Sequence, residues 1–399
     1  MSESTLLINQ LPDDCLLKIF YLICDLPDLI HCYQVCQKWN QLISHRARKA
    51  KYLLVGWSQL RTWKYSFAPE PKVPKDSIYY EGKFKFPEID LADLFTKIKI
   101  LDLFFLDNSD PGLKTLVNFI NNSESLKGLI CKRDMLHELS INCQHIEMLA
   151  TDGLNDYYTN QGYGAKLSQL SLFEVVFTDF ALNIKHFPGL RRLHLKTYSH
   201  DQRESNGPYP GPELKHLEIL ELLTWVGNLH VYYGFQFMDH CPSLKSAFIT
   251  IEFVADVFIN KNILNYNLQD LVITFANGID LKVLPAVLVK YPNIKHLGIL
   301  LYGSARSKIK EHHIIELFNI LPKLVVLDLT GSLLNKSAID FIDQYCLKNN
   351  RQITLYDGRH HFVPKTLRCY KRITEDSDFL RNVFFKNRKS YNLPLLMDQ

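Results

Sequence analysis

Apolar residues recur along most of the chain in one spacing, Leu-x-x-Leu-x-Leu, in which other small or aliphatic residues replace some leucines. Ten units of this kind lie between residues 96 and 356, and their first positions are 20 to 30 residues apart. The last two template positions of each unit are two residues apart, so they lie on one face of an extended chain and predict a short strand that buries that face. The units are Ile98, Leu101 and Leu103; Leu126, Leu129 and Cys131; Ile146, Leu149 and Thr151; Leu167, Leu170 and Leu172; Leu190, Leu193 and Leu195; Leu214, Leu217 and Ile219; Leu244, Ala247 and Ile249; Leu268, Leu271 and Ile273; Ile294, Leu297 and Ile299; and Leu324, Leu327 and Leu329.

The stretches between these strands predict helices or irregular returns, as in residues 112–121. Proline precedes four of the later strands, where it ends a helix and favours an extended entry to the strand, at Pro188, Pro242, Pro292 and Pro322. One strand and one return cannot bury a leucine row alone, whereas stacked neighbours form a continuous core. The pattern therefore predicts an α/β array of repeated units.

These units resemble leucine-rich repeats, and the resemblance covers roughly residues 96–356. It implies a solenoid of about ten repeats that curves into a horseshoe, with parallel strands on its concave face. Individual motifs are degenerate, since Thr151 and Ala247 occupy leucine positions. An ordinary α/β sheet of alternating strands and helices is the alternative, but its strands would read as unbroken apolar runs.

Strand alternation also predicts which side chains face outward on the concave side. Because Leu101 and Leu103 point inward, Asp102 and Phe104 point outward, and these positions repeat along the array. Their mixture of aromatic and charged residues, with no dominant sign, favours a protein partner over a phosphate backbone. We therefore predict that a protein substrate, which the sequence does not identify, contacts Asp102, Phe104, Lys132, Asp152, Phe173, His194, Lys196, Glu218 and Phe248.

The first 50 residues follow a different pattern, that of three short helices. Pro12, followed by two aspartates, suits a helix entrance, because proline is tolerated in the first turn and acids favour the positive end of the helix dipole. The apolar residues between Leu16 and Ile23 cover more than one stripe of this helix, so some must face something beyond a small core. Pro27 begins the second helix, and apolar spacing from Val35 predicts the third. A purely structural N-terminal cap is the alternative.

Residues 8–48 resemble an F-box, because Leu11-Pro12, Ile19-Phe20, Asp28-Leu29 and Val35-Cys36 with Trp39 agree in order and spacing. In that family the module binds a Skp-type adaptor and so attaches the protein to a cullin ubiquitin ligase. Cys15 departs from the family pattern, in which another aliphatic or polar residue is frequent. Carried over to this chain, the adaptor-binding residues are Leu11, Pro12, Leu16, Ile19, Phe20, Leu29, Val35, Cys36 and Trp39.

Four segments follow from these patterns: an F-box domain at 1–50, a connector at 51–95, the leucine-rich repeats at 96–356 and a basic C-terminal cap and tail at 357–399. The connector is too aromatic for a free linker, so we expect it to pack on the first edge of the repeats. From Arg351 onward the chain carries ten Lys and Arg against five Asp and Glu, which is typical of a solvated cap; a site for an anionic partner is the alternative. The apolar residues 391–396 are hypothesised to fold back onto the concave face.

Composition changes this picture little, since 47% hydrophobic and 22% charged residues in a chain of 399 are typical of a globular protein. The net charge of +4 does not argue for nucleic acid. No apolar run approaches the roughly 18 residues that a membrane span needs. Nine cysteines in no regular framework suit a reducing compartment. We therefore expect a cytoplasmic or nuclear protein with neither a nucleic-acid nor a membrane partner.

Candidate chemistry is sparse. The sequence has no Gly-rich phosphate loop, nucleophile elbow or HExxH motif, so we predict no catalytic residues, no metal site and no cofactor. The histidine pairs 312–313 and 360–361 are adjacent in sequence and do not converge on one metal as an i, i+4 pair does. Together the resemblances predict a non-catalytic substrate-recognition subunit of a Skp-cullin-F-box ubiquitin ligase. The alternatives are a repeat scaffold without a ligase role and an enzyme with an unrecognised site in the connector.

Overall fold

The computed structural model describes residues 8–56 and 76–356, apart from residues 88, 139–140, 155–158, 174, 199–206, 226–230, 253–255, 276–281, 302–308, 310, 330–331, 333 and 335. The described residues form two compact units, an N-terminal unit that ends at Lys166 and a C-terminal unit that begins at Leu167. Residues 57–75 of the predicted aromatic connector (51–95) and the whole predicted tail (357–399) lie outside the described residues.

The N-terminal unit starts with three α-helices, which are followed by parallel strands. The strands lie side by side in the order β2-β1-β3-β4-β5. The elements are η1 (Ile8–Gln10), α1 (Asp13–Leu22), α2 (Leu26–Val35), α3 (Gln37–Ala47), β1 (Tyr52–Val55), β2 (Ser77–Tyr80), α5 (Leu91–Leu94), β3 (Ile100–Asp102), α6 (Leu113–Asn122), β4 (Gly128–Ile130), α7 (Arg133–Glu138), β5 (Met148–Thr151) and η2 (Tyr163–Lys166).

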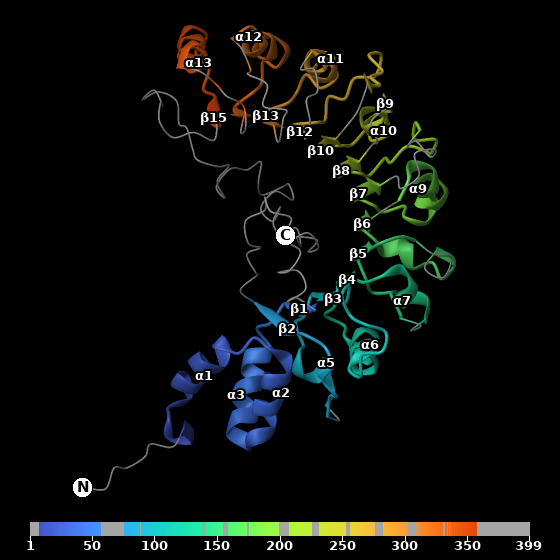
Figure 1. The fold of residues 1–399 in the computed structure, drawn as a ribbon, viewed down its shortest axis with the longest axis vertical. Helices are drawn as coiled ribbons and strands as arrows, with labels where there is room; N and C mark the ends of the chain where they lie inside the picture. Colours follow the sequence, from blue (N-terminus) through green and yellow to red (C-terminus); the bar gives the residue numbers. More distant parts are fainter. Residues whose placement is uncertain are drawn as a thin grey trace, which may run out of the picture. The chain divides into compact units, whose positions relative to one another are not determined.

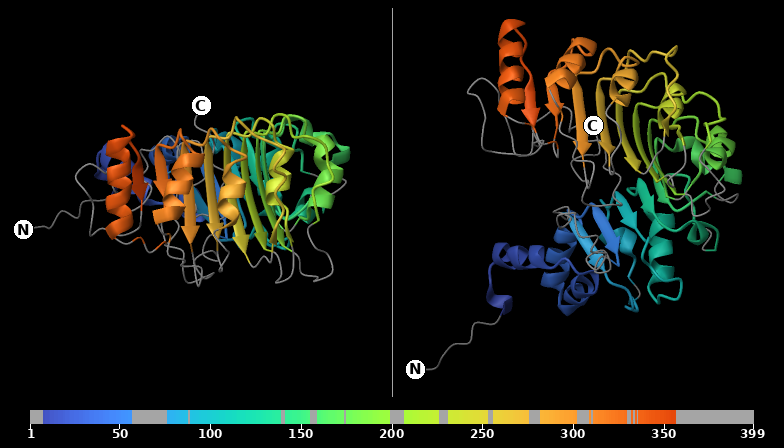
Figure 2. Two further views of the ribbon diagram at one scale, coloured as in Figure 1. Left: turned by 90° about the horizontal axis from the view of Figure 1, so that it is seen from above. Right: turned by 45° about the horizontal axis from the view of Figure 1, so that its top comes forward.

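The C-terminal unit repeats strand and return with the strands in chain order, β6-β7-β8-β10-β12-β13-β14-β15, all parallel, and β9 and β11 pair separately. Helices α10 to α13 lie along one face of these strands (Figure 1), and the strand arrows point the same way (Figure 2). The elements are β6 (Gln169–Phe173), α9 (Phe177–Asn183), η3 (Ile184–His186), β7 (Arg192–Tyr198), β8 (Ile219–Trp225), β9 (Val231–Tyr232), α10 (Gly234–Asp239), β10 (Ser246–Glu252), β11 (Asp256–Val257), β12 (Asp270–Phe275), α11 (Val283–Leu288), β13 (His296–Leu301), α12 (Glu311–Ile320), β14 (Val326–Asp328), α13 (Lys336–Lys348) and β15 (Thr354–Tyr356).

The repeated apolar positions form the core of both units. Leu101, Leu129 and Leu149 occupy matching positions on β3, β4 and β5, and each is buried. The two weak matches, Thr151 and Ala247, are buried as well. Because each inward side chain lies beside its counterpart on the neighbouring strand, adjacent strands bury one another's apolar faces.

One strand has a different register from the one that we predicted. Leu193 pairs with Leu220, and Leu195 pairs with Leu222, so the inward residues of β8 are three positions later than the predicted ones. The segment matches the leucine spacing twice, because Leu217 serves as the second position of one match and as the first of the other. Hydrogen bonding to β7 selects the second match, in which Glu218 N and Ile219 N both donate to the Arg191 carbonyl.

The described part of the predicted connector supplies two strands at one end of the N-terminal sheet. Strand β1 pairs with β3, and β2 pairs with β1. Backbone contacts also join β2 to the helices, because Tyr79 N donates to the Cys24 carbonyl at 2.7 Å. The three helices are therefore held directly against the first strands.

Candidate functional site

Helices α1 and α2 begin near the prolines that predict them, whereas Val35, which the sequence assigned to the third helix, ends α2, and α3 begins at Gln37. Helix α1 follows Pro12, whose carbonyl accepts hydrogen bonds from the backbone N–H groups of Cys15 and Leu16 at 3.0 and 3.1 Å. Helix α2 is capped by Asp25, whose carboxylate accepts the N–H of Asp28 at 3.3 Å. The N–H groups of Cys15 and Asp28 are among those that a helix start otherwise leaves without partners.

Three of the nine predicted adaptor-binding residues lie in the helices' own core instead. Leu16, Phe20 and Leu29 are at most 1% exposed, so they cannot contact an adaptor. The ring of Phe20 packs edge-on against that of Trp39, with centroids 5.0 Å apart. The sequence alone could not separate these residues from the outer ones, because α1 is apolar on both sides.

Helix α3 is tied to the segment that precedes α1. The indole N–H of Trp39 donates to the Asn9 side-chain oxygen at 2.7 Å. The ammonium of Lys38 donates to the carbonyls of Asn9 and Leu11 at 3.2 and 3.0 Å, and it pairs with Asp13 at 3.1 Å. Leu11, Cys36 and Trp39 are all partly buried at this junction, which leaves part of each accessible to a partner.

An exposed stripe of Pro12, Cys15, Ile19 and Leu22 runs along α1. These residues fall at i, i+3, i+7 and i+10, so they share one side of the helix, and all four are exposed. Leu22 is 82% exposed, although it is a large apolar residue. We call this set the α1 stripe. Val35, the remaining predicted adaptor-binding residue, is also exposed, at the end of α2.

Sequence reasoning missed Leu22 and treated Cys15 only as a departure from the family. Their spacing from Pro12 and Ile19 places all four residues on one side of a single helix, but it does not tell which side of that helix is covered. Two of the predicted residues, Pro12 and Ile19, therefore lie in a stripe with two that were not predicted, Cys15 and Leu22.

The predicted outward residues of the N-terminal unit differ widely in exposure. Asp102 is only 2% exposed, which contradicts its predicted place on an open surface. Its carboxylate accepts the N–H of Phe104 at 3.0 Å, and burial raises its pKa to about 7. Its strand neighbours Leu54 and Ile130 are apolar and buried, so the carboxylate lies in an apolar row. Phe104 and Asp152 are half-buried, and Lys132 is exposed, as predicted.

The outward residues of the C-terminal unit need two corrections. Phe248 is only 6% exposed, because the outward side chains of neighbouring strands pack on one another. Glu218 does not belong to the row, because it precedes β8 and binds Arg191 at 2.8 Å and Lys245 at 2.9 Å. The register change places Glu221 opposite His194 and Phe248 instead.

A polar cluster crosses β6, β7 and β8. The Ser171 hydroxyl lies 3.0 Å from Nδ1 of His194, and the Glu221 carboxylate lies 3.9 Å from the same nitrogen. Phe173 packs edge-on against the His194 ring at 5.8 Å. Burial, reinforced by the positive charges of Arg192 and Lys196, lowers the pKa of His194 to about 4. The imidazole is therefore neutral at pH 7.

A second polar cluster joins β10, β12 and β13. The Asp270 carboxylate accepts a hydrogen bond from the Ser246 hydroxyl and contacts Nδ1 of His296 at 2.6 Å. Neither cluster matches a nucleophilic triad, in which the histidine contacts the serine with one nitrogen and the acid with the other. In the first cluster both groups approach Nδ1 of His194, and in the second the acid separates serine from histidine.

We expect His194 to reduce the stability of the fold as the pH falls from about 6.5 to about 4. Its folded pKa is about 4 against an ordinary 6.5, so the unfolded chain takes up a proton first within this window, and stability falls with it. Unfolding by urea should be measured for the wild type and for His194→Gln at pH 7 and pH 4. The wild-type free energy of unfolding, taken relative to the variant, should fall by roughly 3 kcal/mol between them. A difference that does not change with pH would contradict this assignment.

No helix among the described residues is both long and apolar enough to span a membrane. In the same part of the chain, three or more His, Cys, Asp or Glu side chains nowhere gather as a metal site would need.

Comparison with known proteins gives a family match for one segment of the chain. One solved structure with some similarity is a crystal structure of a Bacteroides fragilis protein, 15% identical, which covers 69% of this chain and 74% of that one with a TM-score of 0.33. A likeness this weak carries no argument about fold or function. The comparison with curated proteins found no match. The F-box-like family model matches residues 8–48, which include all three N-terminal helices, so this segment is an F-box-like domain.

Proposed function

We propose that this chain is the substrate-recognition subunit of a Skp-cullin-F-box ubiquitin ligase. The observation that carries the proposal is the F-box-like match over residues 8–48, whose first helix presents the exposed α1 stripe. An apolar stripe in water is unfavourable, and large exposed apolar residues grouped on one side of a helix are typical of a protein interface. In this proposal a Skp-type adaptor covers the α1 stripe and Val35, and it connects the chain to a cullin.

We propose further that residues 96–356 are a leucine-rich-repeat solenoid with the outward strand face as its substrate receptor. The parallel pairing of successive strands and the buried leucine positions within each unit support this. The outward candidates that remain after correction are Phe104, Lys132, Asp152, Phe173, His194 and Lys196. Glu221 takes the place of Glu218 in the row, but it is itself buried.

The proposed mechanism requires no catalytic group in this chain. A receptor that holds a substrate lysine near a ubiquitin-charged enzyme raises the effective concentration of the reacting groups. The chain then contributes position and specificity, and we propose that it works in the cytoplasm or the nucleus. The competing candidate is a repeat scaffold that binds partners without promoting ubiquitination.

The deciding experiment is co-purification of the full chain with a Skp-type adaptor and a cullin from cell extract. We expect both to be recovered with the wild-type chain, because the adaptor bridges the F-box-like domain to the cullin. Recovery of other partners without any Skp-type adaptor would refute the ligase proposal and leave the scaffold. Ubiquitination of a co-purified partner in the reconstituted complex would separate the two candidates further.

A further inference from the structure

Strand β7 presents three nitrogen-bearing side chains on its outward face, at the alternate positions Arg192, His194 and Lys196. We call this set the β7 basic stripe. Among the described outward residues of the adjoining strands, only Glu221 on β8 is acidic, because β6 contributes Gln169, Ser171 and Phe173 and β8 contributes Ile219 and Leu223. The outward face at β7 therefore carries two permanent positive charges against one negative charge.

The histidine in this stripe has an unused hydrogen-bonding atom. Nε2 of His194 is buried and has no hydrogen-bond partner. When the Ser171 hydroxyl donates to Nδ1, the proton of the neutral ring is on Nε2. The Nε2–H group is then a hydrogen-bond donor without an acceptor. A buried donor without an acceptor is costly, so this arrangement calls for an acceptor from outside the described residues.

We propose, building on the substrate-receptor role above, that the β7 basic stripe receives an anionic side chain of the protein substrate, either a carboxylate or a phosphate. The anion would accept from Nε2 of His194 and pair with the ammonium of Lys196. Phe173 and Lys196 are half-buried, so this end of the stripe is open to a ligand. The buried Arg192 guanidinium, which donates to Gln169 at 3.3 Å, adds positive charge beneath it.

Binding of an anion here would also change the titration of His194. The charged groups that face it are Arg192 and Lys196 on its own strand and Glu221 on β8, while the described part of β6 adds none. The two cations disfavour a protonated ring, and an anion would offset them. The imidazole pKa should therefore rise when the site is filled, so the nuclear magnetic resonance titration of His194 provides a readout independent of affinity.

The test uses the purified full chain, without an adaptor, and three degenerate peptide libraries. The libraries differ only at one central residue, which is serine, glutamate or phosphoserine. We expect the glutamate or phosphoserine library, or both, to bind about tenfold more tightly than the serine library, a difference of about 1.4 kcal/mol. The ratio between the two anionic libraries identifies carboxylate or phosphate as the preferred group. Equal binding of all three libraries would overturn the proposal.

Lys196→Gln is the main variant, because it removes one charge from a half-buried position and leaves the Arg192 and Glu221 charges in place. It should remove most of the preference for anionic peptides. Lys245→Gln removes the same charge from an exposed position bound to Glu218, and it should leave the preference unchanged. Equal losses in both variants would overturn the proposal, because they would show a general charge effect. His194→Gln provides a second variant, which should also weaken anion binding.

The outcome is separable from that of the proposed function. Lys196→Gln lies outside the F-box-like domain, so it should still bind the adaptor. A wild-type chain that binds no adaptor but prefers anionic peptides would refute the ligase role alone. A chain that binds the adaptor but shows no such preference would refute the β7 anion site alone.

Discussion

Replacing Ile19 and Leu22 together by alanine is expected to weaken binding of a Skp-type adaptor by about a hundredfold while the helices stay folded. Leu22 is 82% exposed and Ile19 is 37% exposed, so their loss removes little of the domain's own packing. Fully burying a large aliphatic side chain contributes roughly 1.5 to 3 kcal/mol, and because Ile19 is already partly covered, the pair should contribute roughly 2 to 4 kcal/mol to the interface. Affinity can be measured by titrating the purified adaptor into the full chain.

Leu182→Ala with Leu347→Ala is the matched control. These leucines are 71% and 66% exposed on α9 and α13, so the control removes as much exposed apolar surface elsewhere. It should leave adaptor affinity unchanged. Wild-type affinity in the Ile19 and Leu22 variant would mean that the adaptor does not cover the α1 stripe.

Phe20→Ala tests the stability of the helical domain rather than the adaptor interface. Its ring lies in the core against Trp39, so its removal should cost roughly 3 to 5 kcal/mol of stability and would disrupt a domain this small. Loss of adaptor binding in that variant would not identify the interface. Only substitutions of residues that are exposed in the free chain can distinguish the loss of a contact with the adaptor from unfolding of the domain.

The second large effect is expected from Asp239→Ala, which should destabilise the C-terminal unit by about 3 to 5 kcal/mol. Asp239 ends α10, and its carboxylate binds the ammonium of Lys290 at 2.6 Å. The two side chains are only 6% and 1% exposed. Without the carboxylate, a buried ammonium loses its counter-ion, and water cannot replace it at low cost.

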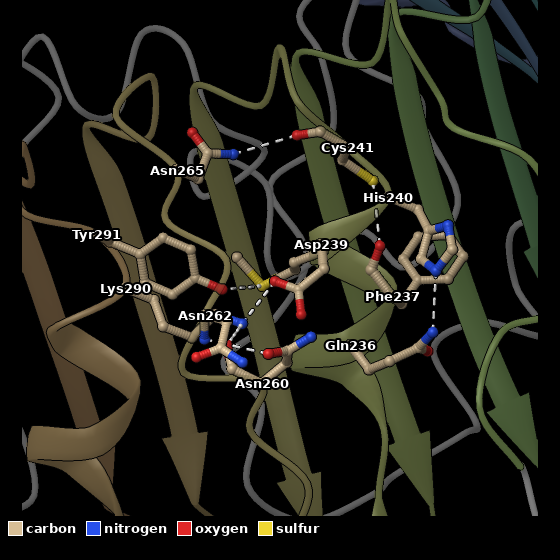
Figure 3. A network of polar contacts seen from close by, with 11 residues as sticks. Gln236, Phe237, Asp239, His240, Cys241, Asn260, Asn262, Asn265, Lys290 and Tyr291 are labelled. Carbon is tan, nitrogen blue, oxygen red and sulfur yellow. Dashed lines mark hydrogen bonds and ion pairs between the residues drawn. The ribbon is translucent and has the colours of Figure 1, made fainter.

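The pair belongs to a network that holds the return between β10 and β12 (Figure 3). Lys290 also donates to the carbonyl of Asn260 at 2.8 Å, and its own carbonyl accepts the N–H of Asn265 at 2.9 Å. The Asn265 side chain donates to the Cys241 carbonyl at 3.2 Å. The described residues of this return contain no helix. Polar contacts therefore hold it against the strands, whereas apolar helix packing holds the neighbouring returns.

A double-mutant cycle tests the ion pair. Asp239→Leu with Lys290→Met replaces both charges by apolar groups, and it should be much less destabilising than either single change, because no charge is left buried alone. The pair of Glu218, which is half-buried, and Lys245, which is exposed, provides the control cycle, with a coupling energy of about 1 kcal/mol. Chemical denaturation of each variant, with hydrogen exchange of residues 256–267, measures the coupling energy in both cycles. Equal coupling in the two cycles would contradict the argument.

Much of this architecture could be predicted from local patterns. The leucine spacing located the strands, because an apolar residue at every second position has to be buried on one face of a strand. Pro12 with its two aspartates located the start of α1, because helix capping depends on neighbouring residues alone. The spacing of Pro12, Ile19 and Leu22 also places them on one side of α1, although only the tertiary structure showed which side of the helix was covered.

Several decisive features depended on contacts between distant residues. Two overlapping leucine triplets were equally good for β8, and pairing with β7 selected one, which placed Glu221 rather than Glu218 beside His194. Leu16 and Ile19 are both apolar residues of one helix, and only packing against α2 and α3 assigned one to the core and left the other exposed. The Asp239–Lys290 pair joins residues 51 positions apart, which no local pattern connects. The sequence by itself determined where strands and helices form, because those choices depend on near neighbours. The tertiary structure decided register, burial and ion pairing, because these depend on which segments come into contact.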